Sequence, residues 1–141
     1  MLMLDNQLCF AIYSASLAMT KLYKPLLAKL GLTYPQYLVM LVLWEQDDLT
    51  VSELGERLAL DSGTLTPLLK RLEAAGLLVR IRDVGDERRV RVTLNAAGHR
   101  LKTRAAKVPH CLLAAAQCSV PELTSLTQQI RSLRNRIKAA G

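Results

Sequence analysis

The stretch TVSELGERLALDSGTLTPLLKRLEAAGLLVRIRDVGDERRVRVTL, residues 50–94, decides the fold. It opens with the Ser/Thr-x-x-Glu spacing of a capping box, in which Thr50 and Glu53 satisfy each other's backbone amides at a helix start. Leu54 and Leu58 follow at i, i+4 and predict a short amphipathic helix. The apolar repeat then stops, so we expect a tight turn before the next element.

A second helix is predicted from Ser62 to Ala75, with Asp61 or Ser62 as its N-cap and Gly76 just past its end. Its inner face carries four leucines at helical spacing, namely Leu65, Leu68, Leu69 and Leu72. Its outer face carries hydrogen-bond donors, namely Ser62, Thr64, Thr66, Lys70 and Arg71. Such a face suits a helix that lies against phosphates and base edges in the major groove of DNA.

Two short strands are expected after this helix, at residues 77–82 and 90–94, where apolar and β-branched side chains dominate. The turn between them includes Asp86 and ends in a pair of arginines, Arg88 and Arg89, at the tip of the ribbon. A ribbon alone is also compatible with a solvated hairpin on an α+β enzyme. The helix pair in front of it favours a winged helix-turn-helix, in which Arg88 reaches the minor groove.

The composition is compatible with one basic domain that binds a polyanion. The chain has 141 residues, half of them apolar, and a formal net charge of +7. Its basic residues gather in two segments, 70–91 and 100–107, which favours double-stranded DNA as a partner. No apolar run approaches the ~18 residues of a membrane-spanning helix, so we expect a cytoplasmic protein that does not enter a membrane.

The three cysteines, Cys9, Cys111 and Cys118, are odd in number and lack the spacing of metal ligands or of a secreted disulfide framework. They are therefore either buried thiols or redox-active ones. The sequence contains no Gly-rich phosphate loop, no HExxH and no GxSxG. We accordingly expect no cofactor, no metal and no enzymatic activity.

Both chain ends predict helices with more apolar surface than a small central core can cover. A first helix, capped by Asp5 or Asn6 and ended by Gly31, is uncharged over residues 8–19. The last helix, which starts after Ser119, repeats apolar residues at near-heptad spacing: Leu123, Leu126, Ile130, Leu133 and Ile137. These helices indicate a partner subunit, although packing of both ends within one subunit is the alternative.

We therefore expect a mostly α fold with a small β-wing and a dimerisation module made from the N- and C-terminal helices. The whole chain would form one domain, with residues 5–33 and 100–141 as dimerisation helices and residues 34–98 as the DNA-binding region. The helix that follows the wing is expected to run towards Cys118, with an interruption near Pro109.

The wing segment from Asp86, Glu87 and Arg88 to Asn95 and Gly98 is similar to the D-x-R…T-x-x-G signature of the MarR family of bacterial winged-helix repressors. Three further segments resemble one branch of that family, the thiol-sensing organic hydroperoxide resistance regulators: LDNQLCF at 4–10, LTYPQY at 32–37 and LDSGTLTP at 60–67. The resemblance covers nearly the whole chain, and it implies a homodimeric repressor.

In that branch, the residue matching Cys9 is the peroxide-sensing thiol, and the tyrosines matching Tyr23 and Tyr34 hydrogen-bond it in the reduced state. A position in the first turn of a helix favours a thiolate, the form that peroxides oxidise to sulfenic acid. Without the resemblance, Cys9 would more simply be an inert small hydrophobe.

A second cysteine resolves the sulfenic acid in two-cysteine members of the branch, and its position corresponds here to Ala114. Cys111 and Cys118 flank that position at i−3 and i+4, which would place all three residues on one helical face. Either thiol is a candidate to form a disulfide, and a mixed disulfide with a small thiol is the alternative.

The leading hypothesis is a repressor that binds a pseudopalindromic operator and is released when an organic hydroperoxide oxidises Cys9. Alternatives are a MarR-type repressor gated by a small aromatic acid, a thiol peroxidase and an architectural DNA protein. The distance along the first helix adds one constraint, since the fourteen residues between Cys9 and Tyr23 span roughly 21 Å. If both serve one site, Tyr23 must come from the partner subunit.

Overall fold

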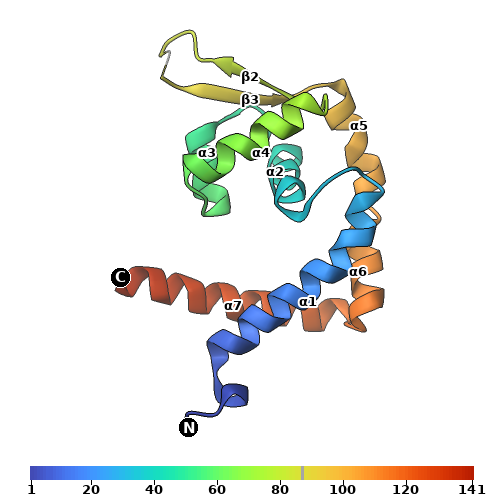
Figure 1. The fold of residues 1–141 in the computed structure, drawn as a ribbon, viewed down its shortest axis with the longest axis vertical. Coiled ribbons are helices and arrows are strands. Elements are labelled where there is room, and N and C mark those ends of the chain that lie inside the picture. The colour runs from blue at the N-terminus through green and yellow to red at the C-terminus, as the bar shows by residue number, and fades with distance from the viewer. Residues whose placement is uncertain (87) are drawn as a thin grey trace. The chain divides into compact units, whose positions relative to one another are not determined.

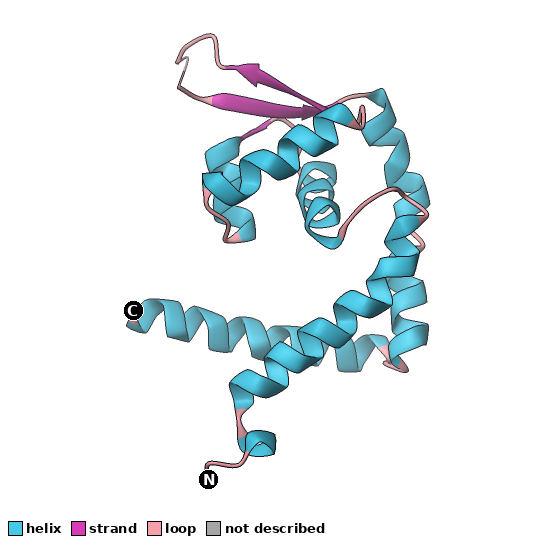
Figure 2. Ribbon diagram, viewed as in Figure 1, coloured by secondary structure: helices cyan, strands magenta, loops and turns pink. Residues whose placement is uncertain are grey.

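The computed structural model describes residues 1–86 and 88–141, so Glu87 of the wing signature lies outside the described residues. The chain forms two compact units. The central unit is Tyr23–Lys107, and the end unit combines Met1–Leu22 with Val108–Gly141. Figure 1 gives the order of the elements along the chain, and Figure 2 shows that strands occur in the central unit beside its helices.

The described elements are a 3-10 turn (Leu4–Asn6), α1 (Leu8–Ala28), α2 (Tyr34–Glu45), β1 (Leu49–Thr50), α3 (Val51–Leu58), α4 (Ser62–Ala74), β2 (Leu78–Arg82), β3 (Val90–Leu94), α5 (Ala96–Ala105), α6 (Val108–Ala116) and α7 (Val120–Ala140). The predicted class, mostly α with a small β-wing, is confirmed. Among the described helices, none combines the length and the apolar character needed to cross a membrane.

The helix pair of the central unit begins where its capping residues predict. Thr50 and Glu53 form a capping box at the start of α3. Asp61, and not Ser62, caps α4, because its carboxylate accepts a hydrogen bond from the Thr64 amide at 2.7 Å. Gly76 follows α4 with a φ of +79°, the left-handed conformation that ends helices and favours glycine.

The sheet has three antiparallel strands in the order β1-β3-β2. The long ribbon of β2 and β3 was predicted, and its register pairs Leu78 with Leu94 and Arg82 with Val90. The third strand, β1, was missed because two residues are too few to show a period. It pairs Leu49 with Val92 and ties the ribbon to the segment between α2 and α3.

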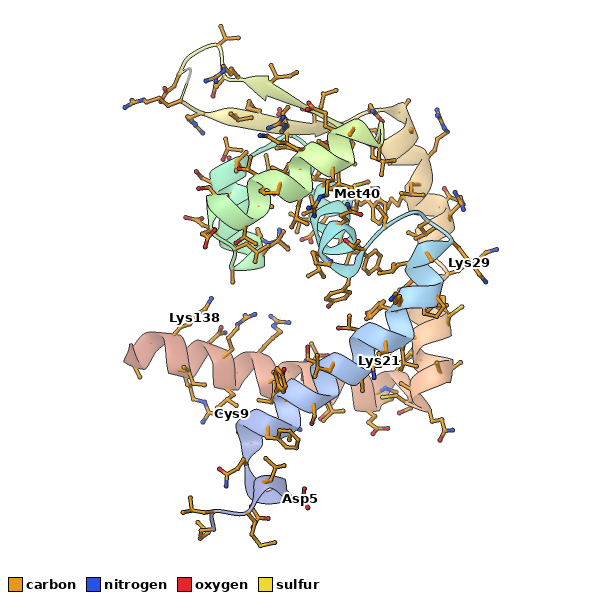
Figure 3. The ribbon with its side chains drawn as sticks, viewed as in Figure 1. Asp5, Cys9, Lys21, Lys29, Met40 and Lys138 are labelled. Atoms are coloured by element: carbon orange, nitrogen blue, oxygen red, sulfur yellow. The ribbon has the colours of Figure 1, made fainter. Side chains whose placement is uncertain are left out.

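The core of the central unit lies where α2, α3, α4 and the sheet meet. Its largest fully buried side chains are Leu27, Met40, Leu43, Leu54, Leu65, Leu69, Leu72, Leu78, Val39 and Val92. Figure 3 labels Met40 within this packed region. All four leucines predicted for the inner face of α4 are buried, so the polar side of that helix remains exposed.

The N-terminal helix begins later than predicted. Asp5 and Asn6 do not cap α1, because they belong to the separate 3-10 turn. The Asn6 amide donates to the Met3 carbonyl at 3.0 Å, and the Gln7 side chain donates to the same carbonyl at 3.0 Å. Cys9 is therefore the second residue of α1, still within its first turn as expected.

The helix after the wing is interrupted as predicted, between α5 and α6, just before Pro109. The break before the last helix was also expected, but it comes before Cys118 and not after it. Helix α6 ends at Ala116, and Gln117 takes a left-handed φ of 53°. Cys118 therefore lies beyond the helix that carries Cys111, and the expectation of a shared helical face is wrong.

The end unit leaves much of its apolar surface uncovered within the described chain. On α1 the exposed apolar side chains are Leu8, Phe10, Ile12, Tyr13 and Leu17. On α7 they are Val120, Leu126, Ile130 and Ile137. Of the five predicted seam residues, Leu126, Ile130 and Ile137 are 47%, 48% and 63% exposed, so this chain alone does not bury the seam.

Candidate DNA-binding surface and thiol site

Helix α4 presents one buried face and one donor-rich face. Ser62, Thr64, Lys70 and Arg71 are exposed, and Thr66 is half-buried. The Asp61 cap fixes the first turn, and the hydrogen bond from the Thr64 amide lowers the pKa of its carboxyl, so that the cap stays charged. The arrangement holds a rigid helix with its donors directed away from the core.

The turn of the wing is organised by Asp86. Its carboxylate accepts from the Arg88 amide at 3.0 Å and from Arg88 Nε at 3.3 Å, while its carbonyl accepts from the Arg89 amide at 2.9 Å. The Arg88 side chain is nevertheless 92% exposed. Arg89 lies 3.9 Å from Asp83 and is about half exposed. Arg88 is thus the cation that projects most freely from the ribbon tip.

Two further arginines of the ribbon are held by carboxylates, which the sequence analysis did not foresee. Arg91 donates from Nε to Asp48 Oδ1 and from Nη2 to the Asp48 carbonyl, each at 2.9 Å. This pairing raises the pKa of Arg91. Arg80 is held in a similar way by Glu73 of α4. Only the folded chain reveals these partners, because each pair joins two different segments of the fold.

The Cys9 thiol is exposed in the first turn of α1, near the N-terminal end of that helix in Figure 3. Within the described residues it has neither a hydrogen-bond partner nor a disulfide partner. Neighbouring Leu8 and Phe10 are exposed as well, so the thiol stands in an apolar surface. Such a surface would become buried if a second molecule covered it.

Tyr23 and Tyr34 form a cluster in the central unit, together with Tyr37. The rings of Tyr23 and Tyr34 have centroids 4.9 Å apart, and those of Tyr23 and Tyr37 are 5.8 Å apart. Burial, with the neighbouring Tyr34 and Tyr37, raises the pKa of Tyr23 to about 12. Burial also raises the pKa of Tyr34. The phenols are therefore neutral donors at physiological pH, and sequence analysis had not singled out Tyr37.

The other two cysteines differ in their surroundings. Cys111 is exposed on α6, as is Ala114. Cys118 is half-buried beside a largely apolar cavity of about 220 Å³ in the end unit, which Glu122 also lines. Burial and the nearby Glu122 carboxylate raise the pKa of the Cys118 thiol, which disfavours its thiolate. Among the described residues, no group of three His, Cys, Asp or Glu side chains is placed to hold a metal ion.

Known proteins share both the sequence and the fold. A family model described as transcriptional regulator SarA/Rot matches residues 21–105. The chain is 50% identical to the organic hydroperoxide resistance transcriptional regulator of Bacillus subtilis, over 92% of this chain and 88% of that protein. It is 49% identical to the HTH-type transcriptional regulator TtmR of Methylorubrum extorquens, over 96% of this chain and 70% of that protein.

Solved structures of AbfR, a protein of Staphylococcus epidermidis, have the same architecture. Reduced AbfR bound to DNA aligns with a TM-score of 0.78 and 34% identity, covering 95% of this chain and 94% of that one. Disulfide-formed AbfR aligns with a TM-score of 0.66 and 35% identity, covering 97% and 91%. With its winged helix-turn-helix and its 50% identity to the Bacillus regulator, the chain belongs to the MarR-family winged-helix transcriptional regulators, in the group of the organic hydroperoxide resistance regulators.

Proposed function

We propose that the protein is a homodimeric repressor that binds a pseudopalindromic operator and leaves it when an organic hydroperoxide oxidises Cys9. The observation that carries the redox part is an exposed thiol at a helix start, set in uncovered apolar surface, in a chain half identical to a hydroperoxide resistance regulator. Because a repressor acts on the chromosome, we place it in the cytoplasm.

The DNA-binding role rests on the two faces of α4 and on the ribbon. Thr64, Thr66, Lys70 and Arg71, with Ser62 at the helix start, supply donors to phosphates and base edges. Arg88 and Arg89 at the ribbon tip would reach the adjacent minor groove, where narrow width attracts arginine. The AbfR relative was solved on DNA, which supports the same use of this fold here.

The dimer rests on the uncovered surface of the end unit. Exposed apolar side chains on α1 and α7, among them Phe10, Leu17 and Ile130, form more apolar surface than isolated surface residues ordinarily do. A second copy offers the same surface, as two-fold symmetric dimers require. Residues 5–33 and 100–141 would then supply the dimerisation helices, and residues 34–98 the reading heads.

The chemical step is a two-electron oxidation of sulfur. The Cys9 thiolate attacks the distal oxygen of the hydroperoxide, an S–O bond forms, and the O–O bond breaks. The alkoxide that leaves takes up a proton and departs as the alcohol, while Cys9 becomes a sulfenic acid. One hydroperoxide is consumed and one sulfur is oxidised, so the reaction switches the protein once and is not catalytic.

The tyrosines would be supplied across the dimer. Cys9 and Tyr23 both belong to α1, and fourteen residues of α-helix span roughly 21 Å. The Tyr23 and Tyr34 hydroxyls have no hydrogen-bond partner within the described chain, which leaves them able to donate to the partner subunit's thiol. Oxidation would remove those bonds and bias the dimer towards a spacing of the reading heads that does not fit the operator.

Resolution of the sulfenic acid requires a second thiol. Attack by that thiol on Cys9 sulfur forms a disulfide and releases water. Cys111 is the better placed of the two candidates, because it is exposed, whereas Cys118 is partly buried and its thiolate is disfavoured. A small external thiol would give a mixed disulfide by the same step.

The test is operator binding by the reduced protein before and after stoichiometric cumene hydroperoxide, measured by fluorescence anisotropy. The wild-type protein should lose affinity, and dithiothreitol should restore it. Cys9→Ser should bind DNA normally and ignore the peroxide, while Cys118→Ser, at the half-buried thiol whose thiolate is disfavoured, serves as the matched control and should still respond. Release of Cys9→Ser by peroxide would contradict the proposal.

Two rival functions make different predictions. A repressor gated by an aromatic acid would release DNA on addition of the acid without peroxide. The largely apolar cavity of the end unit, however, carries Glu122, whose carboxylate repels an acid. A thiol peroxidase would consume many equivalents of peroxide per chain in the presence of a reductant. With the same reductant, the switch should consume peroxide no faster than the reductant restores DNA binding.

A further inference from the structure

Glu73 holds Arg80 in a three-bond clamp between α4 and β2. Arg80 donates to Glu73 Oε1 from Nη2 at 3.0 Å and from Nε at 3.3 Å, and its backbone amide donates to Oε2 at 3.1 Å. The Arg80 side chain is 25% exposed and that of Glu73 is 37% exposed. The clamp fixes both the guanidinium and the strand itself, so it differs from a solvent-exposed surface ion pair.

The clamp joins the two elements that the proposed function places on DNA. Glu73 follows Lys70 by three residues and Thr66 by seven, so all three share one side of α4. Arg80 pairs in register with Val92 within the ribbon whose tip carries Arg88. Helix α4 and strand β2 follow each other along the chain, and they are in direct contact.

The charges of the pair also matter for DNA. The hydrogen bonds from Arg80 lower the pKa of Glu73, so the carboxylate is charged at physiological pH. A carboxylate on a DNA-facing side repels phosphate unless a cation neutralises it. Arg80 neutralises it and, in doing so, turns its Nε and Nη2 donors, two of five guanidinium N–H groups, towards the carboxylate. The pair therefore contributes no net charge to the attraction of phosphates.

We propose that Glu73 is a specificity-determining positioning residue of the DNA-binding surface, a proposal that rests on the DNA-binding role above. It withholds Arg80 from phosphates, which any DNA sequence offers, and it fixes the ribbon on α4 so that Arg88 meets the groove in one orientation. Binding energy is thereby kept for contacts that depend on sequence and groove shape.

Glu73→Gln should therefore strengthen binding to unrelated DNA. Glutamine keeps the shape of the side chain but removes the charge that holds Arg80, and one additional arginine–phosphate contact raises affinity about eight-fold near 0.1 M salt. The salt slope for unrelated DNA should steepen by about 0.9. Operator affinity should rise less, because the ribbon is no longer fixed, so the ratio of operator to unrelated binding should fall, by at most about eight-fold.

Glu45→Gln is the matched control, because Glu45 pairs with Arg57 at the same 3.0 Å distance on an exposed surface and loses the same charge. The probes are a duplex enriched from a random-sequence library by the reduced wild-type protein and a scrambled duplex of equal composition. Glu45→Gln should leave the ratio unchanged. Adding Arg80→Gln to Glu73→Gln should return the slope for scrambled DNA to the wild-type value.

Arg80→Gln alone should change DNA affinity in the opposite direction. It should weaken binding to both duplexes, because it leaves the Glu73 charge unpaired. A purely structural clamp would make Glu73→Gln and Arg80→Gln weaken binding alike, and that result would overturn the proposal, as would equal effects of Glu73→Gln and Glu45→Gln. Failure of the wild-type protein to enrich any duplex would instead overturn the proposed function.

Discussion

The two units of this chain differ in how much of their apolar surface and charge is buried or paired within the chain. The central unit, Tyr23–Lys107, buries its leucines against three helices and a sheet, caps its helices and pairs most of its ribbon arginines with carboxylates. The end unit leaves apolar side chains of α1 and α7 exposed and has only two acidic residues, Asp5 and Glu122. The central unit buries its apolar surface within the chain, whereas the end unit requires a second copy to cover its own.

This difference separates two kinds of stability. Folding of the central unit should depend on its own packing and not on protein concentration. The end unit gains its stability by association, and its apparent stability should rise with concentration by mass action. A thiol that lies in the surface of the end unit can change how two subunits pack without changing the fold of the central unit.

Breaking the association should have the largest effect. Leu126→Asp places a charge in the apolar seam of α7, where Leu126 is 47% exposed in the single chain. We expect monomers or aggregates in sedimentation and at least about a 100-fold loss of operator affinity, because two linked half-sites no longer act together. Asn135→Asp, on the polar side of the same helix, is the control. An intact Leu126→Asp dimer would argue against this seam.

Overpacking the core of the central unit should have the second-largest effect. A Cβ at Gly98 would collide with the Leu77 carbonyl oxygen and lie 3.1 Å from Leu94 Cδ2. Gly98→Ala should lower the free energy of unfolding by ~3 kcal/mol or more, at every protein concentration. Gly85→Ala meets only an ordinary contact, 3.7 Å from Asp83 Oδ1, and should change stability little. Urea unfolding curves measure both variants.

Removing a DNA contact from the central unit should leave the fold of that unit unchanged. Arg88→Ala should weaken operator binding by about 1–3 kcal/mol if Arg88 reads groove shape. Lys70→Ala should mainly reduce the salt slope, by about one, if Lys70 contacts phosphate. Anisotropy titrations at several salt concentrations separate the two effects. An Arg88→Ala affinity equal to wild type at matched salt would remove the wing from the interface.

The smallest expected effect concerns alkaline pH. The native protein holds the Tyr23 proton up to a pKa of about 12, whereas the ordinary pKa is 10.0. This contribution to stability is complete below pH 10 and is lost as the pH rises towards 12, because the native state then binds more protons than the unfolded chain. Tyr23→Phe should show a shallower loss in denaturant midpoints over that range. Tyr13→Phe, at an exposed tyrosine of the end unit, should match wild type.

Local rules were enough for most of the central unit. The Thr50–Glu53 capping box, the leucines of α4 and Gly76 each act within one turn of chain, so their structure could be read from spacing. The same rules failed at Asp5 and Asn6, where a 3-10 turn forms instead, and after Ala116, where a left-handed Gln117 ends the helix.

The sequence by itself determined the family, the order of the elements and which faces are apolar, because periodicity and capping are short-range properties. Only the tertiary structure decided which charges meet. The Glu73–Arg80 and Asp48–Arg91 pairs, the strand β1 and the cluster of Tyr23 with Tyr34 and Tyr37 all join segments that no periodic rule connects. Such contacts depend on how separate elements pack, and they set the electrostatics of α4, of the ribbon and of the tyrosine cluster.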